Sequence, residues 1–200
     1  MNFPLLKTFK VSPHTTSFLN RKVNEYKITH PSWSLDTNFD RSKGYQAKNL
    51  IEWDDKEFQE FSEVDIKNLI SSHLGIDKSR VFYRWAHFLD YEKGGSMDYH
   101  VHVFNEDFVL FIYLKDCNSG GDTVFHLNSF NEEYMRRTQV SVKPRENDAA
   151  IFSSYLLHRG EYTEENKRIF VFGIKVDMTD GKEGDIIDKK VIQNNRENIS

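Results

Sequence analysis

The sequence contains very little cysteine, since Cys117 is the single one among 200 residues. No disulfide can form within the chain, which fits a reducing compartment. The first ten residues, M-N-F-P-L-L-K-T-F-K, carry a charge early and lack the apolar segment of a signal peptide. No apolar run reaches the roughly 20 residues needed to span a bilayer. We therefore expect a soluble, cytoplasmic protein with no membrane partner, and we interpret Cys117 as a small loop residue rather than a nucleophile.

A strong charge of one sign is also missing. The formal net charge is −4, so no global basic field is present and a dedicated phosphate-binding surface is not indicated. Nucleic acid is therefore not an expected partner. The hydrophobic fraction of 38% and the charged fraction of 29% are typical of a soluble globular protein. A chain of this length suits one domain with a buried core.

Aromatic side chains, in contrast, are plentiful. They make up 14% of the chain, with 16 Phe and 9 Tyr, and such side chains favour strands and pack well between sheets. From residue 80 onward, short apolar segments alternate with turns, and the continuous apolar run at 108–114 suits a strand buried on both faces. This pattern predicts an antiparallel jelly roll or barrel.

Helical periodicity is confined to the region before this. Between residues 53 and 74, Phe58 and Phe61 are followed by apolar residues at helical spacing, and Gly75 is a natural stop. Ser62 resembles an N-cap, so we expect two helices with a break there. The first 50 residues carry mixed signals, including a strand near Phe9. We expect one domain with a strand and helical support section at 1–79, a β core at 80–176 and a solvated polar tail at 177–200.

Three histidines stand out within the expected β core. His100 and His102 are one residue apart, and alternation along a strand places such residues on the same side. His158 ends a later apolar run and must come from another strand. Three imidazoles can fill one face of a metal ion and leave the opposite face for other ligands. Arg168, on the strand after His158, can pair with a small carboxylate, and Tyr113 can add a hydrogen bond to it.

In this order and spacing, the segment resembles the prolyl-4-hydroxylase-like group of iron(II)/2-oxoglutarate oxygenases. That group is marked by Y-x-x-G, a first His in H-x-D or H-x-E, an apolar strand ending in Y-L, G-G-x-T, a second His, and Arg or Lys about ten residues further on. The matching positions are residues 91–94, His100, 113–114, 120–123, His158 and Arg168. The resemblance covers about ninety residues, roughly 83–176, and implies a double-stranded β-helix of the cupin-like kind.

The sequence departs from that group at one position, where the expected carboxylate ligand is replaced by His102. Three interpretations are open. His102 itself completes a site of three neutral histidines, or Asp98, also two residues from His100, supplies the carboxylate. In the third, the site is impaired and the domain binds a partner without reacting.

The resemblance implies iron(II) held by His100, His102 and His158, with 2-oxoglutarate on the metal and its far carboxylate at Arg168 and Tyr113. With O2 as the second cosubstrate, it implies hydroxylation of a peptidyl or small-molecule substrate; a halogenase is less favoured, because His102 fills the space that a halide needs. A different metal such as zinc, or a non-catalytic binding module, are the alternatives on the same scaffold. His87 and His126 are candidates for the lining of a substrate channel.

Overall fold

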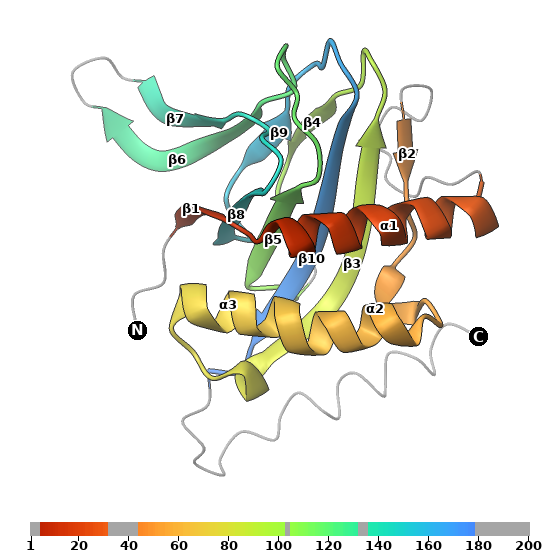
Figure 1. Ribbon diagram of the computed structural model, residues 1–200. Helices are drawn as coiled ribbons and strands as arrows, with labels where there is room; N and C mark the ends of the chain where they lie inside the picture. Colours follow the sequence, from red (N-terminus) through yellow and green to blue (C-terminus); the bar gives the residue numbers. More distant parts are fainter. Residues whose placement is uncertain (1–4, 32–43, 103–104, 132–135, 179–200) are drawn as a thin grey trace, which may run out of the picture.

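Two antiparallel sheets facing each other form the body of the molecule (Figure 1). The structure is a computed structural model, and it describes residues 5–31, 44–102, 105–131 and 136–178. The major sheet contains, in spatial order, β1 (Leu6–Lys10), β8 (Asp148–Ser153), β5 (Phe108–Tyr113), β10 (Lys167–Val176), β3 (Val81–Tyr91) and β2 (Gly44–Gln46). The minor sheet contains β4 (Met97–His100), β9 (His158–Gly160), β6 (Thr123–Asn131) and β7 (Arg136–Val142). This arrangement confirms the predicted mostly-β architecture, and β5 is buried along its whole length as expected.

Three helices cover the outer face of the major sheet (Figure 1). They are α1 (Pro13–Thr29), α2 (Lys56–Phe61) and α3 (Lys67–Leu74), with short 3₁₀ turns at Leu50–Glu52 and Lys78–Arg80. Ser12 starts α1, because its side chain accepts the backbone N–H of Thr15 and Pro13 follows at the first helical position. Sequence periodicity gave no indication of this long helix.

The expected break between α2 and α3 is absent. Ser62–Ile66 forms a π-helical turn that joins the two helices, and Ser62 itself has right-handed helical backbone angles instead of those of an N-cap. The Tyr83 hydroxyl donates to the Ser62 carbonyl at 2.6 Å, which satisfies a backbone group inside the irregular turn. Gly75, with φ of 68°, ends α3 in the left-handed conformation, as predicted.

The major sheet therefore lies between two apolar layers. Alternation along β3 and β10 sends Phe88, Phe170 and Phe172 toward the helices, and it sends Leu89 and Val171 toward the minor sheet. Segments from before residue 80 contribute strands β1 and β2 to the same sheet as well as the helices. Nearly all of the predicted polar tail at 177–200 lies outside the described residues.

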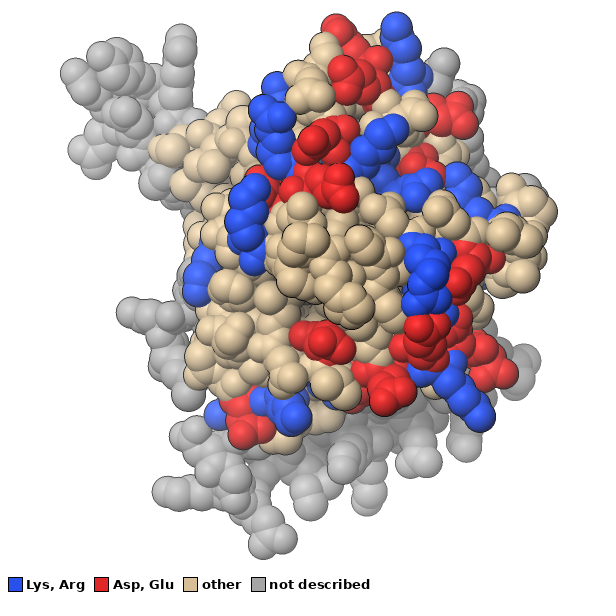
Figure 2. Space-filling model, in the orientation of Figure 1, with Lys and Arg blue, Asp and Glu red and all other residues tan. Residues whose placement is uncertain are grey.

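The surface carries charges of both signs. On the face shown in Figure 2, Lys and Arg side chains are interspersed with Asp and Glu, in keeping with the small net charge of −4. No helix among the described residues has the length and apolar character required to cross a membrane.

A close approach inside the molecule generates the first prediction. Gly173 on β10 lies opposite Trp85 on β3, and a Cβ at Gly173 would come within 2.3 Å of the indole ring. We expect Gly173→Ala to lower the free energy of unfolding by about 1–3 kcal/mol, because the ring must move or the strands must separate. Chemical denaturation measures this change.

Gly160→Ala is the matched control. A Cβ there would meet its nearest neighbours, Tyr91 and Met97, at 3.5–3.6 Å, which is ordinary contact. Equal losses of stability in the two variants would contradict the steric explanation.

Candidate metal centre

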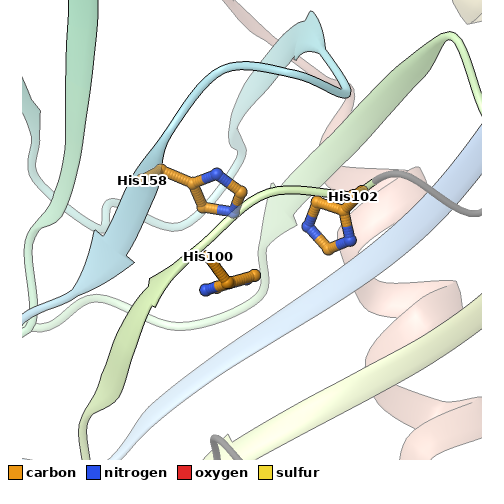
Figure 3. Close-up of side chains that lie close together, drawn as sticks. All are labelled: His100, His102 and His158. Atoms are coloured by element: carbon orange, nitrogen blue, oxygen red, sulfur yellow. The ribbon is translucent and has the colours of Figure 1, made fainter.

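The three histidines predicted from the sequence meet between the two sheets (Figure 3). His100 is the last residue of β4 and lies directly opposite His158, the first residue of β9. His102 follows β4 by two residues, and its backbone N–H donates to the Ser154 carbonyl at 2.8 Å. One ring nitrogen from each histidine lies within 4.8 Å of the other two. This spacing allows a single ion to be bound by all three.

Hydrogen bonds set the direction in which two of these rings present their lone pairs. Nδ1 of His158 lies 2.8 Å from the Leu156 carbonyl, and Nδ1 of His100 lies 2.7 Å from the Asp98 carbonyl. A carbonyl only accepts, so each Nδ1 carries the proton and each Nε2 keeps a free lone pair. The Nε2 atoms of His102 and His158 are buried without a hydrogen-bond partner among the described residues. Unsatisfied, converging nitrogens of this kind fit a metal ion.

Burial keeps two of these imidazoles neutral, which is the form that binds a metal. Desolvation, assisted by the neighbouring histidines, lowers the pKa of His102 to about 2. Desolvation likewise lowers the pKa of His158 to about 3, even though its bond to Leu156 acts in the opposite direction. The donor set of three imidazole nitrogens suits iron, zinc, copper and nickel.

Asp98 does not join this group. Among the residues that the structure describes, the candidate metal-binding group consists of His100, His102 and His158 alone. Asp98 is exposed, and it contributes through its backbone carbonyl, which orients His100. The geometry therefore favours His102 over Asp98 as the third donor.

A cavity adjoins the histidines between the two sheets. It encloses about 410 Å³, part of which is open to solvent. The residues that line it are mostly apolar, with a few polar groups among them: His87, Leu89, Tyr91, Met97, His100, His102, Phe111, Thr123, His158, Gly160, Lys167, Ile169 and Val171. A small, largely apolar cavity with convergent polar groups is the usual form of a ligand site.

Lys167 supplies a buried cation to this cavity. Its side chain is 1% exposed, its Nζ donates to the Gly121 carbonyl, and it lies 5.0 Å from the centre of the Tyr91 ring. Desolvation lowers its pKa to about 8. The Gly120–Gly121 turn lies against the Lys167 side chain and requires glycine at both positions. The φ angles are 69° and 72°, and a Cβ at Gly120 would lie 2.4 Å from the Tyr162 carbonyl oxygen.

The structure does not bring Arg168 to the cavity. Alternation along β10 turns it toward the helices, where it forms an ion pair with Asp90 at 2.8 Å and hydrogen bonds with Asn20 and Asn24 of α1. Burial raises the pKa of Asp90, but the hydrogen bonds from Arg168 and Lys27 outweigh this effect and hold it below its usual value. Arg168 thus fastens α1 to the sheet.

Tyr113 lies beside the cavity without lining it. Its hydroxyl is fully buried and donates to the Thr123 hydroxyl at 2.9 Å, and Thr123 does line the cavity. Burial raises the pKa of Tyr113, so the hydroxyl keeps its proton. Tyr113 therefore acts on the cavity through Thr123.

The two further histidines have different positions. His87 lines the cavity, as expected, and its ring stacks on Trp85 at 4.9 Å, while Trp85 is also 5.2 Å from His102. His126 is not among the lining residues; it is half-buried on the minor sheet, and its Nε2 lies 3.0 Å from the Tyr99 hydroxyl.

Sequence comparisons give no relatives for this chain. No protein-family model matches it, and no curated protein matches it either.

Solved structures, in contrast, share its fold. A prolyl-4-hydroxylase from Pseudomonas putida superposes with a TM-score of 0.62 at 13% identity, over 86% of this chain and 93% of the other. A Trichoplax adhaerens prolyl hydroxylase bound to a hypoxia inducible factor peptide gives 0.62 at 14% identity, over 86% and 84%. The epimerase SnoN, in complex with Fe3+, alpha ketoglutarate and nogalamycin RO, gives 0.62 at 11% identity, over 90% and 88%.

These similarities confirm the expected fold. The chain has the double-stranded β-helix of the prolyl-4-hydroxylases and the 2-oxoglutarate–iron(II) oxygenases, with a group of three histidines between its two sheets. At such low identity the comparison concerns the fold alone, so the chemistry must be argued from the site.

The histidine geometry generates the second prediction. We expect the protein to bind one divalent ion per chain, and we expect His158→Ala to weaken that binding by more than about 100-fold, because it removes a direct donor. Asp98→Ala retains the backbone carbonyl that orients His100 and should leave affinity unchanged. Titration with Co(II) measures both affinities. Loss of binding in Asp98→Ala, with binding retained in His158→Ala, would contradict this arrangement.

Proposed function

We propose that this protein is an iron(II)/2-oxoglutarate-dependent dioxygenase that hydroxylates a peptidyl or small-molecule substrate. The proposal rests mainly on one observation: three imidazoles converge within 4.8 Å beside a cavity that also contains a buried lysine. A metal ion and a dicarboxylate would satisfy these two features together. The fold shared with structurally similar oxygenases supports the proposal.

The ligands in those structures give the substrate classes. One prolyl hydroxylase binds a peptide fragment, and SnoN binds Fe3+, alpha ketoglutarate and nogalamycin RO. A peptide and a small molecule are therefore both compatible with this scaffold.

In our proposal, Lys167 rather than Arg168 receives the far carboxylate of 2-oxoglutarate. Lys167 points into the cavity and has a backbone carbonyl as its hydrogen-bond acceptor, whereas Arg168 is already paired with Asp90 on the other face of the sheet. The family pattern accepts Arg or Lys about ten residues after the second histidine, and Lys167 is nine residues after His158. Thr123, held by Tyr113, offers a hydroxyl in the same cavity.

The roles of the chain's own residues follow from their positions. His100, His102 and His158 would hold the ion through nitrogen atoms whose orientation is fixed before binding. Lys167 would orient the cosubstrate, and the apolar walls formed by Leu89 and Ile169 would exclude water around it. Iron(II), bound together with 2-oxoglutarate, would activate O2, which is the oxidant in this class of enzyme.

Zinc is the second candidate metal, because three neutral imidazoles with an open position also suit zinc and a bound water. A zinc protein should act without O2 or 2-oxoglutarate, and a non-catalytic module should produce no succinate at all. The test of the proposed function separates these cases.

For this test, metal content is determined on anaerobically purified protein, and succinate formation from 2-oxoglutarate is then measured with added iron(II). We expect the wild type to bind iron and release succinate, and we expect His102→Ala to lose at least about 100-fold of that activity, because a direct metal donor is removed. Asp98→Ala should remain active. An inactive wild type alongside an active His102→Asp would contradict the three-histidine site and indicate a scaffold whose iron chemistry has lapsed.

The buried lysine generates the fourth prediction. We expect Lys167→Met to weaken 2-oxoglutarate binding by at least about 30-fold, or roughly 2 kcal/mol, because the far carboxylate then has no positively charged side chain in the cavity lining. In the wild type, the dissociation constant should rise as the pH increases through about 8, where the pKa of Lys167 lies and its proton is lost. Lys167→Arg should bind 2-oxoglutarate with the same affinity below and above pH 8, since arginine remains charged. Calorimetric titration of metal-loaded protein measures these affinities.

Arg168→Met is the matched control on the opposite face of the same strand. It should leave 2-oxoglutarate affinity within about twofold of the wild type, yet lower the free energy of unfolding by about 1–3 kcal/mol because Asp90 loses its main partner. If Arg168→Met loses 2-oxoglutarate binding and Lys167→Met retains it, Arg168 rather than Lys167 binds the far carboxylate.

A further inference from the structure

The cavity has two distinct ends along the paired strands β3 and β10. Successive strand pairs that line it are Tyr91 with Lys167, Leu89 with Ile169, and His87 with Val171. The next pair, Trp85 with Gly173, lies just beyond the lining. The lysine marks the first end. The third and fourth pairs mark the other end, which adjoins the histidines, because Phe111 beside Val171 lies 5.6 Å from His158 and Trp85 lies 5.2 Å from His102. Lys167 and Val171 are about 13 Å apart along the strand.

The lining of this cavity contains no acidic side chain among the described residues. The three histidines are neutral donors, and Lys167 is the single basic side chain other than histidine in the lining. Asp122 and Glu161 act on Lys167 from outside the cavity. Glu161 is paired with Arg159, whereas Asp122 accepts a hydrogen bond from the neutral Ser141 hydroxyl and keeps its negative charge. Both lie at the lysine end.

Charge in the filled cavity is therefore unbalanced. A divalent ion brings two positive charges and protonated Lys167 brings one, while 2-oxoglutarate brings two negative charges. One positive charge is left over, at the end where His102 replaces a carboxylate. Because an uncompensated charge in an apolar cavity is unfavourable, a further anion is attracted there.

We propose that the third component accepted by this cavity is a monoanion, held at the His87 end beside the histidines. This inference rests on the proposed function and narrows its substrate class to molecules that carry one carboxylate or a similar anionic group, or to a halide. His87 lines this end of the cavity, and the Trp85 ring, which stacks on His87 and lies against Gly173, forms a wall next to it. With a carboxylate at position 102 the charges would cancel, and a neutral molecule would be preferred.

The test uses Co(II)-loaded protein saturated with 2-oxoglutarate at constant ionic strength. The probes are acetate, azide and chloride, with acetamide as the neutral counterpart of acetate. Binding is followed by the visible absorption of Co(II) and by the shift in melting temperature, which also reports anions that do not touch the metal. Wild type is compared with His102→Asp, which adds the missing charge, and with His102→Asn, which has a similar shape without it.

We expect acetate and azide to bind to the wild type and acetamide to bind at least about tenfold more weakly. Once Co(II) loading of each variant has been verified, His102→Asp should bind the anions at least about tenfold more weakly than His102→Asn, because the two side chains have a similar shape and differ in charge. Tighter binding of acetate than of chloride assigns the site to an organic carboxylate, and the reverse order assigns it to a halide.

Two results would overturn the inference alone, and a third would overturn it together with the proposed function. In the first, the wild type binds metal and 2-oxoglutarate but binds acetate and acetamide equally well. The monoanion site is then absent, while the proposed function stands. This comparison uses the wild type alone, so it does not depend on whether a variant folds. In the second, anions bind equally to His102→Asp and His102→Asn, and the charge argument fails in the same way. If the wild type binds neither Co(II) nor 2-oxoglutarate, the proposed function itself fails, and the inference fails with it.

Discussion

Strand β10 has a neighbouring strand on each edge and a packed layer on each face, so every side chain along it must be matched by its surroundings. This constraint explains the opposite environments of two adjacent bases. Arg168 faces the helices and has Asp90 as its partner. Lys167 faces the cavity, where its acceptor is a backbone carbonyl and no lining residue carries a carboxylate. Among the described residues, the lining of the cavity offers Lys167 no carboxylate, and this indicates a site for an anionic ligand.

Much of the fold and of the histidine group could be predicted from sequence, because each rests on a local pattern. Apolar segments bounded by turns predict the strands of the fold. The i, i+2 spacing of His100 and His102 predicts that these two histidines lie on the same side. The choice between Arg168 and Lys167 could not be made in this way. The residues that follow, Ile169 to Phe172, are apolar without interruption, since both faces of β10 are buried. Alternation therefore gave no indication of which base faces inward.

Helix α1 was missed for a related reason. It starts at a clear Ser-Pro signal, but its buried side includes polar residues such as Thr16 and Lys22, which weaken the apolar periodicity. Lys22 is buried with Asp55 as its partner, so a tertiary contact permits what the sequence pattern disfavours. Asn20 and Asn24, which accept hydrogen bonds from Arg168, lie on this helix. Because the sequence did not predict α1, it gave no sign that Arg168 has a structural role.

The glycine beneath Trp85 has a consequence for how the strands align during folding. A shift of β10 by one residue against β3 would exchange Lys167 and Arg168, and a base would still face each side. Charge therefore discriminates poorly between the two alignments. The same shift would place Phe172 or Ile174 under the indole, where even a Cβ has no room. Gly173, which has no side chain, thus favours the register in which Lys167 faces the cavity, although it lies six residues away along the strand.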